Sequence, residues 1–283
     1  AEFKKGKAGR FEPGLPAKGD GQLLFMLNGL AKLKEDGQMA IIQNGSSLFN
    51  GDAGSGPSEI RRYLIENDWL DAIVQLPNNV FYNTGIATYI WLVMKNKPVT
   101  HQGKVQLIDA SACCSARRKN IGSKNVDITK ACRDLIVEAY GVYVDDIYHG
   151  ADENDNEIVV KSKVMDAIDL GYNKIIVETP QLDENGNIVL KKKKPVADKS
   201  KRDTENVPLA EDIDVYFERE VIPYNPQAWI DKTKTKVGYE IPFTRTFYEY
   251  KQIEPSEKIA ARIEEHEKGL MAKLHDLFGG ERL

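Results

Sequence analysis

The hydrophobic and polar positions in the first part of the chain change period several times. Between Asp20 and Lys34 the leucines recur near every 3.6 residues, which predicts a helix with Asp20 as its N-cap. Residues 39–43 (MAIIQ) then form an apolar run of strand length, followed by a turn-rich stretch. We therefore expect a helix, a buried strand and a long loop in this order.

The next segments repeat the pattern. Ser58 and Glu59 open the stretch EIRRYLIEN, whose apolar residues share one helical face, and residues 71–76 (DAIVQL) form a second apolar strand. A strand, helix and strand in succession predict a right-handed α/β unit whose ligand-binding loops lie beyond the carboxyl ends of the strands. Arg61 and Arg62 are expected to be solvated or paired with acidic neighbours, on a helix that faces away from those loops.

The third apolar run, residues 88–94 (TYIWLVM), follows the second strand after about eleven residues without helical periodicity. This connection is too short for an ordinary parallel crossover. The run therefore predicts a strand antiparallel to its neighbour. Residues 104–111 predict a further strand.

Beyond residue 112 the pattern changes. Residues 129–140 predict a helix, residues 173–178 a strand, and LDENGNIVL a hairpin around Asn185 and Gly186. The segment near 181–206 is polar and rich in lysine, and we interpret it as a charged insertion.

The longest helical pattern covers residues 255–277. Its apolar stripe recurs at steps of three and four residues, which favours packing against another helix. The partner is a second subunit or the chain's own domain, and the pattern leaves both open. The stripe consists of Ile259, Ile263, Leu270, Leu274 and Leu277.

Composition limits the classes of function. The formal net charge is −4, so any contact with DNA must be local or shared with a partner. No apolar run approaches the length that spans a bilayer, and we expect a cytoplasmic protein without membrane contact. Cys113, Cys114 and Cys132 lack CxxC spacing and are interpreted as free thiols. The four histidines are scattered, so no metal site is expected, and Arg117 to Lys119 are interpreted as a solvated loop.

No phosphate-binding loop of the GxGxxG or GxxxxGK type is present, and neither HExxH nor GxSxG occurs. An unrelated nucleotide-binding α/β enzyme is therefore disfavoured. The distinctive stretch is 37–97, in which a strand ends at Asn44-Gly45 and is followed by IRRYLIEN, then LPNNVFYNTGI, then a final apolar strand. This stretch resembles the modification subunit of type I restriction enzymes. The segments 173–180 and 225–251 and the terminal helix are also similar to the tail of those subunits.

The resemblance implies a site-specific methyltransferase that acts on adenine N6 with S-adenosylmethionine, and a target base that leaves the DNA helix. It also implies DNA, a specificity subunit and a restriction subunit as partners. The family's cofactor loop and its Asn/Asp-Pro-Pro-aromatic motif are both missing from this sequence. The resemblance therefore implies a C-terminal half with no catalytic or cofactor-binding residues, to which no S-adenosylmethionine is expected to bind.

The resemblance places the target-base loop at LPNNVFYNTGI. Phe81 is the expected stacking ring, with the alternative that Phe81 lies in the core and Tyr82 is the exposed ring. Thr84 and Gly85 shape the same loop. Asn44 is expected on the same rim, where it binds the base or, as the favoured interpretation, caps a turn.

The implied fold is α/β, a partial class I methyltransferase (Rossmann-like) sheet with a reversed last strand and an α-rich C-terminal tail. The expected division gives a polar arm (1–19), half of a methyltransferase domain (20–111), a family-specific region (112–254) and an amphipathic helix (255–283). The main alternative in function is a non-catalytic assembly module that docks on the specificity subunit.

Overall fold

The computed structural model describes residues 5, 8–16, 18–250 and 254–277. Contacts between residues divide the chain into two compact units, residues 1–247 and 248–283. No helix in the described ranges is both long and apolar enough to cross a membrane.

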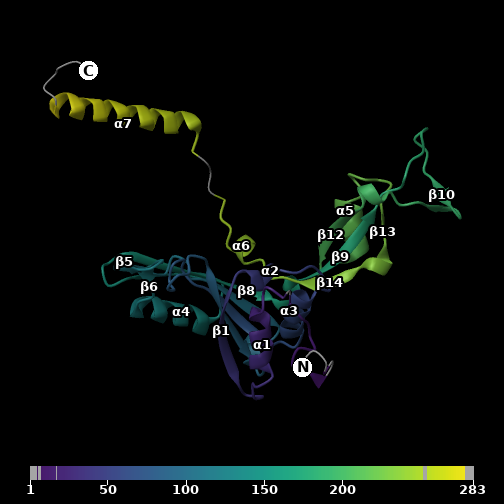
Figure 1. The fold of residues 1–283 in the computed structure, drawn as a ribbon, viewed down its shortest axis with the longest axis horizontal. Helices are drawn as coiled ribbons and strands as arrows, with labels where there is room; N and C mark the ends of the chain where they lie inside the picture. The colour runs from purple at the N-terminus through teal and green to yellow at the C-terminus, as the bar shows by residue number, and fades with distance from the viewer. Residues whose placement is uncertain (1–4, 6–7, 17, 251–253, 278–283) are drawn as a thin grey trace. The chain divides into compact units, whose positions relative to one another are not determined.

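The first unit is built on a six-stranded mixed sheet (Figure 1). Its order is β1-β3-β2-β4-β8-β7, with β2 and β4 parallel and every other neighbouring pair antiparallel. The bounds are β1 Gln38–Asn44, β2 Leu70–Gln75, β3 Thr88–Met94, β4 Lys104–Asp109, β7 Asp146–Ala151 and β8 Glu157–Asp166.

The strand β3 lies between β1 and β2 and runs antiparallel to both, which is the orientation expected from its short connection. The prediction that this reversed strand is the last one of the sheet is wrong, because β4, β8 and β7 extend the sheet beyond β2. The sheet also continues past residue 111, the expected end of the methyltransferase half-domain, because β7 and β8 belong to it.

Helices cover the two faces of the sheet because the strand side chains alternate between two cores. Ile73 and Trp91 face a core shared with α1 and α3, whereas Val74 and Ile108 face a core shared with α4. The sheet is therefore the middle layer of three. The helix bounds are α1 Gln22–Leu30, α2 Ser46–Phe49, α3 Gly56–Glu66 and α4 Lys130–Val142.

A second, antiparallel sheet is centred on β9, which pairs with β12, β13 and β14 (Figure 1). Phe217 of α5 and Val221, which follows that helix, join its core with Ile175 and Val177. Remaining bounds are β5 Ser115–Ile121, β6 Lys124–Asp127, β9 Gly171–Glu178, β10 Leu190–Lys191, β11 Lys194–Pro195, β12 Asp203–Pro208, β13 Trp229–Ile230, β14 Lys236–Tyr239, α5 Ile213–Glu220 and α6 Phe243–Thr246. Short 3-10 helices cover 99–101, 167–170, 199–201 and 232–234.

The α-rich tail predicted after the sheet is wrong, because strands β5 to β14 occupy much of residues 112–247. Most of these strands are short, and several are as polar as DTENVP in β12, so they lack the alternation that identifies a strand. In β8, Ile158, Val160 and Ser162 are buried at every second position, and this alternation was available in the sequence.

The segment near 181–206 contains regular structure. The predicted hairpin around Asn185 and Gly186 is confirmed, with Leu182 bridged to Ile188 and Gly186 at φ 81°. Four lysines, 191–194, follow in a second hairpin whose turn residues, Lys192 and Lys193, have positive φ. The lysine-rich sequence is therefore a turn between β10 and β11.

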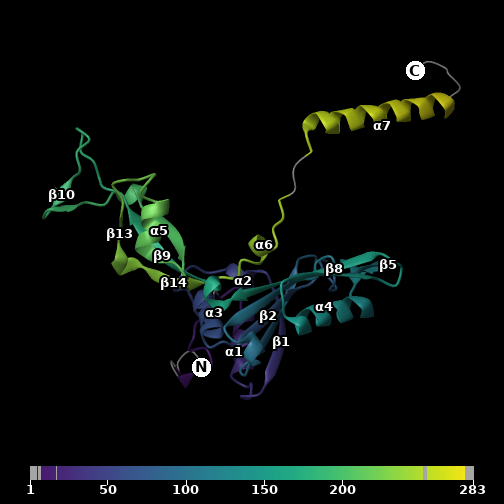
Figure 2. The same ribbon diagram turned by 180° about the vertical axis from the view of Figure 1, so that it is seen from behind.

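The second unit contains α7, Ser256–Leu277, which confirms the long helix predicted for residues 255–277 (Figure 2). Its apolar stripe is exposed to solvent. Leu270 is 60% and Leu277 77% exposed.

Candidate target-base rim

Strand directions bring three carboxyl ends to one edge of the central sheet. Asn44 ends β1 opposite Thr88, and Gln75 ends β2 opposite Tyr89. Asp109 ends β4 beside Gln75. Loops that follow strands at such an edge are the usual place for a ligand site in an α/β sheet. We call this edge and its loops the rim.

Asn44 is held by hydrogen bonds within the rim. Its Oδ1 accepts from the backbone amide of Ser46 at 3.0 Å and from Gln22 Nε2 at 2.8 Å. Gln22 Oε1 in turn accepts from the Asn44 amide at 3.0 Å. These are the turn-capping contacts that the sequence analysis favoured for Asn44.

The loop 77–87 connects β2 to β3 and carries two adjacent aromatic residues, Phe81 and Tyr82, in different environments. Phe81 is partly buried and packs against the α4 core, whereas Tyr82 is 64% exposed. The Thr84 amide approaches the Phe81 carbonyl at 3.4 Å, and Asn83 between them has a φ of 55°, which asparagine tolerates. This tight turn leaves Tyr82 as the exposed ring of the loop.

Gly85 lies on the same loop in a crowded position. A Cβ at Gly85 would lie 3.2 Å from Oδ1 of Asn79, closer than ordinary side-chain contact. Thr84 is half-buried beside it. A side chain at Gly85 would therefore require the end of the Asn79 side chain to shift slightly.

A neighbour that the sequence did not indicate lies against this loop. The hairpin of β5 and β6 approaches it at Gly122, where a Cβ would lie 3.0 Å from Cε2 of Tyr82 and 2.7 Å from Oδ1 of Asn83. The Asn125 amide also donates to the Asn79 carbonyl at 3.2 Å. Arg117 to Lys119, interpreted as a solvated loop, belong to β5.

Arg61 fixes the chain that follows Asn44. The expectation that Arg61 is solvated or paired with an acidic neighbour is wrong. Its side chain is fully buried and donates to backbone carbonyls of Ser47 at 3.1 Å, Asn50 at 2.9 Å and Tyr239 at 2.6 Å. Burial lowers the pKa of Arg61 to about 10, which still leaves it charged at neutral pH. Arg62 has the expected exposed ion pair with Glu66.

His101 ends the short 3-10 helix 99–101 and is partly buried. Its Nδ1 lies 2.9 Å from Oδ1 of the fully buried Asp71, and its ring stacks on Tyr143. The Tyr140 hydroxyl donates to Oδ2 of Asp71 at 2.6 Å. Burial, together with this bond, raises the pKa of Tyr140. The cluster joins β2 to α4 away from the rim.

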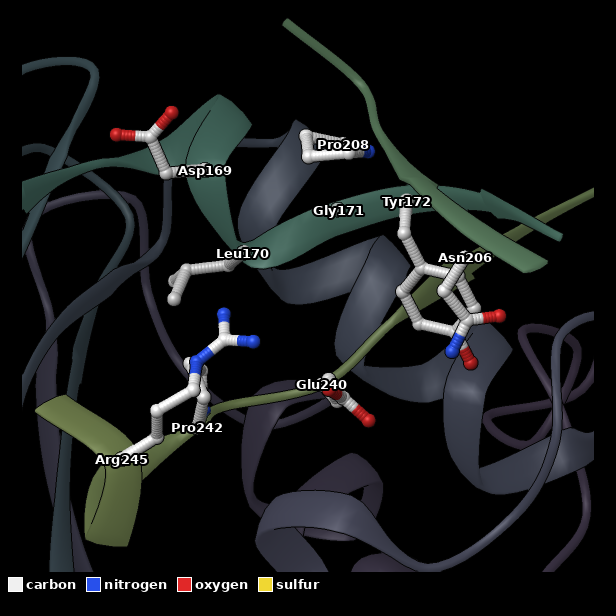
Figure 3. A pocket seen from close by; sticks show the side chains of 9 residues that line it. All are labelled: Asp169, Leu170, Gly171, Tyr172, Asn206, Pro208, Glu240, Pro242 and Arg245. Carbon is white, nitrogen blue, oxygen red and sulfur yellow. The ribbon is translucent and has the colours of Figure 1, made fainter. Parts of the chain in front are cut away.

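Further hollows lie among the described residues. One of about 90 Å³ lies where β9 begins, with Arg245 and Glu240 among its lining side chains (Figure 3). It has room for about three waters and is far below the size of a cofactor pocket. The second, about 340 Å³, lies beside Asp20 and Ser46, and the third, about 360 Å³, is lined by β5.

The cysteine interpretation is confirmed, since Cys113, Cys114 and Cys132 are free thiols. Among the described residues no group of three or more histidine, cysteine or acidic side chains could hold a metal ion.

A family model described as N-6 DNA methylase matches residues 2–177, which include the rim, the loop 77–87 and the β5–β6 hairpin. This chain belongs to the N-6 DNA methylase family. This match and the relatives described next confirm the resemblance to type I modification subunits stated from the sequence.

Curated relatives of this chain are described as methylase subunits of type I restriction enzymes. The type I restriction enzyme MjaIX methylase subunit of Methanocaldococcus jannaschii is 30% identical over 38% of this chain and 19% of its own length. The HindI methylase subunit of Haemophilus influenzae is 31% identical over 36% of this chain and 22% of its own length. The chain thus spans about a fifth of the length of the curated relatives it matches.

A solved structure is also similar to this N-6 DNA methylase chain. It is the methyltransferase subunit of a type I restriction-modification system from Streptococcus thermophilus. The two are 31% identical, the match covers 48% of this chain and 28% of that chain, and the TM-score is 0.43.

Proposed function

We propose that this chain is the C-terminal part of the modification subunit of a type I restriction enzyme. The complete subunit would methylate adenine N6 at specific DNA sites with S-adenosylmethionine. The observation that carries the proposal is the rim loop 77–87 of an N-6 DNA methylase, which leaves one aromatic ring, Tyr82, exposed beside the carboxyl ends of the strands. An extruded adenine needs such a ring to stack on.

The cofactor and the catalytic residues are proposed to come from another part of the subunit. The sequence contains neither an Asn/Asp-Pro-Pro-aromatic motif nor a glycine-rich cofactor loop. In the described residues β1 pairs only with β3, so its other edge is free to pair with a further strand. This supports a Rossmann-like methyltransferase sheet that continues beyond β1.

Within the rim we assign the stacking role to Tyr82 and a supporting role to Phe81. The ring of Phe81 packs against the core that α4 shares with the sheet, and moving the ring would expose that core. Thr84 and Gly85 would set the shape of the loop, and Asn44 would hold the neighbouring turn. The partners under this proposal are DNA, the specificity subunit and the restriction subunit.

Replacement of Tyr82 tests the proposal. In the complete modification subunit assembled with its specificity subunit, Tyr82→Ala is expected to lower kcat/KM for DNA methylation about 5- to 150-fold, because base stacking contributes about 1–3 kcal/mol. Methyl transfer from radiolabelled S-adenosylmethionine measures the effect, and Tyr82→Phe should retain activity. Tyr224→Ala is the control, since Tyr224 is 88% exposed in the turn that follows α5. Unchanged methylation by Tyr82→Ala would refute the assignment.

A second role, assembly, is favoured by α7. Its stripe of Ile259, Ile263, Leu270, Leu274 and Leu277 is exposed, although apolar residues at these steps gain stability from burial against another helix. We propose that this stripe docks on a helix of the specificity subunit. The proposal is compatible with the first.

A charge placed in the stripe distinguishes docking from a solvated helix. Leu270→Asp is expected to weaken co-purification with a co-expressed specificity subunit at least about tenfold, because burying an unpaired carboxylate is costly. Ala272→Asp introduces the same side chain on the opposite face of α7 and should leave co-purification intact. Equal recovery of the two variants would contradict the assembly role.

A further inference from the structure

The β5–β6 hairpin contributes a second surface beside the rim loop. Its tip at Gly122 touches Tyr82 and Asn83, and Asn125 bonds to Asn79, so the hairpin and the loop form one continuous surface. Gly122 has a φ of 58° and no room for a Cβ, so both its conformation and its packing favour glycine. The hairpin is thus positioned where DNA would enter the rim.

The charges on this hairpin are not all neutralised. Arg117 and Lys124 share one acid, Asp127, at 2.5 and 2.9 Å. Arg118 and Lys119 are exposed, and no acidic partner is seen for either among the described residues. Both side chains line the same hollow beside β5.

A polar groove runs along β5. It encloses about 360 Å³ and is lined by Arg117, Arg118 and Lys119 together with Thr129 and Asn154. Asp127 and Glu153 also line it. Asp127 is already engaged by two cations, so the lining has an excess of positive charge and of hydrogen-bond donors. This chemistry fits a phosphate group.

We propose that the β5–β6 hairpin binds backbone phosphates of duplex DNA next to the base that Tyr82 receives. The inference rests on the proposed function and adds to it a surface that holds the strand. Arg118 would donate its planar fork to phosphate oxygens, and Lys119 would act as a point charge on a neighbouring phosphate. Such contacts fix the register of the duplex without reading its sequence.

Salt dependence of DNA binding tests this surface. Binding of the 283-residue chain to a fluorescent DNA duplex is measured by anisotropy over a range of KCl concentrations. Arg118→Gln/Lys119→Gln is expected to lower the magnitude of the slope of log K against log salt by about 1.8 and to weaken binding about 8-fold per lost contact at 0.1 M salt. Both residues are exposed, so the variant should unfold at the wild-type temperature.

The matched control is Lys32→Gln/Lys34→Gln, which removes two exposed positive charges before β1, at the opposite edge of the sheet from the rim. Its salt slope should equal that of the wild type. Three results would each overturn the inference: equal salt slopes for the hairpin variant and the wild type, equal losses of DNA affinity for both variants, or no binding of the duplex by the wild-type chain at low salt.

The stacking role of Tyr82 and the phosphate contacts of the hairpin can be refuted independently. Loss of methylation by Tyr82→Ala with an unchanged salt slope for the hairpin variant would retain the target-base loop and reject the phosphate contacts. A reduced slope with full methylation by Tyr82→Ala would retain the hairpin as a DNA-binding surface and reject the stacking role.

Discussion

Arg61→Met is expected to lower the free energy of unfolding by about 3–5 kcal/mol, measured by urea denaturation followed by circular dichroism. Arg61 is fully buried in the second turn of α3, and its partners are backbone carbonyls. Methionine restores most of the volume but none of the donors. The buried carbonyls of Ser47 and Tyr239 then lose their hydrogen bonds without gaining water.

The effect should extend to the rim, because Arg61 joins parts of the chain that are far apart in sequence. It bonds to Ser47 and Asn50, which follow Asn44, and to Tyr239 at the end of β14. Ser58 of the same helix accepts the Tyr239 amide at 2.9 Å. Amide exchange of residues 45–51 should therefore accelerate in the variant.

The adjacent residue provides the control. Arg62 lies on the same helix with a partly exposed side chain 2.9 Å from Glu66, and Arg62→Met should cost less than about 1 kcal/mol. Equal losses for the two variants would mean that helix propensity or net charge, and not the buried carbonyl contacts, determines the stability.

Asp71→Ala is expected to lower the free energy of unfolding by about 3–5 kcal/mol, again measured by urea denaturation. Asp71 lies at the register shift in β2, where a bulge reorients the side chain. Its carboxylate bonds to Tyr140 of α4 and His101. Removing the carboxylate leaves the Tyr140 hydroxyl without its acceptor in a partly buried site.

Two substitutions separate the contributions in this cluster. Tyr140→Phe removes one bond and should cost about 1–3 kcal/mol, and the double variant with Asp71→Ala should lose little beyond Asp71→Ala alone. Fully additive losses would show that Asp71 and Tyr140 do not act through their mutual bond.

Two adjacent arginines show that the sequence does not predict which of two identical side chains is buried. Arg61 and Arg62 are both arginines on an amphipathic helix, and nothing local reveals that one is buried. Burial of Arg61 depends on β14, which begins 175 residues later. The same holds for His101, whose carboxylate partner lies 30 residues earlier on a strand bulge that no sequence pattern marks.

The rim loop shows the same division. The order of strand, loop and strand and the family followed from the sequence. The choice between Phe81 and Tyr82 depended on which ring packs against α4, and that helix begins more than forty residues later. The basic run 117–119 looked like a solvated loop because both strands of its hairpin, β5 and β6, are mostly polar.

The sequence by itself determined the periodic elements from residue 20 to 111, the terminal helix, the free thiols and the N-6 DNA methylase family. These depend on local periodicity and on motifs that are contiguous in the chain. Only the tertiary structure decided the strand order beyond β3, the burial of Arg61 and Asp71, and the contact between the rim loop and the β5–β6 hairpin. Each of these results from long-range pairing, whose partners satisfy hydrogen bonds or charges that the local sequence leaves open.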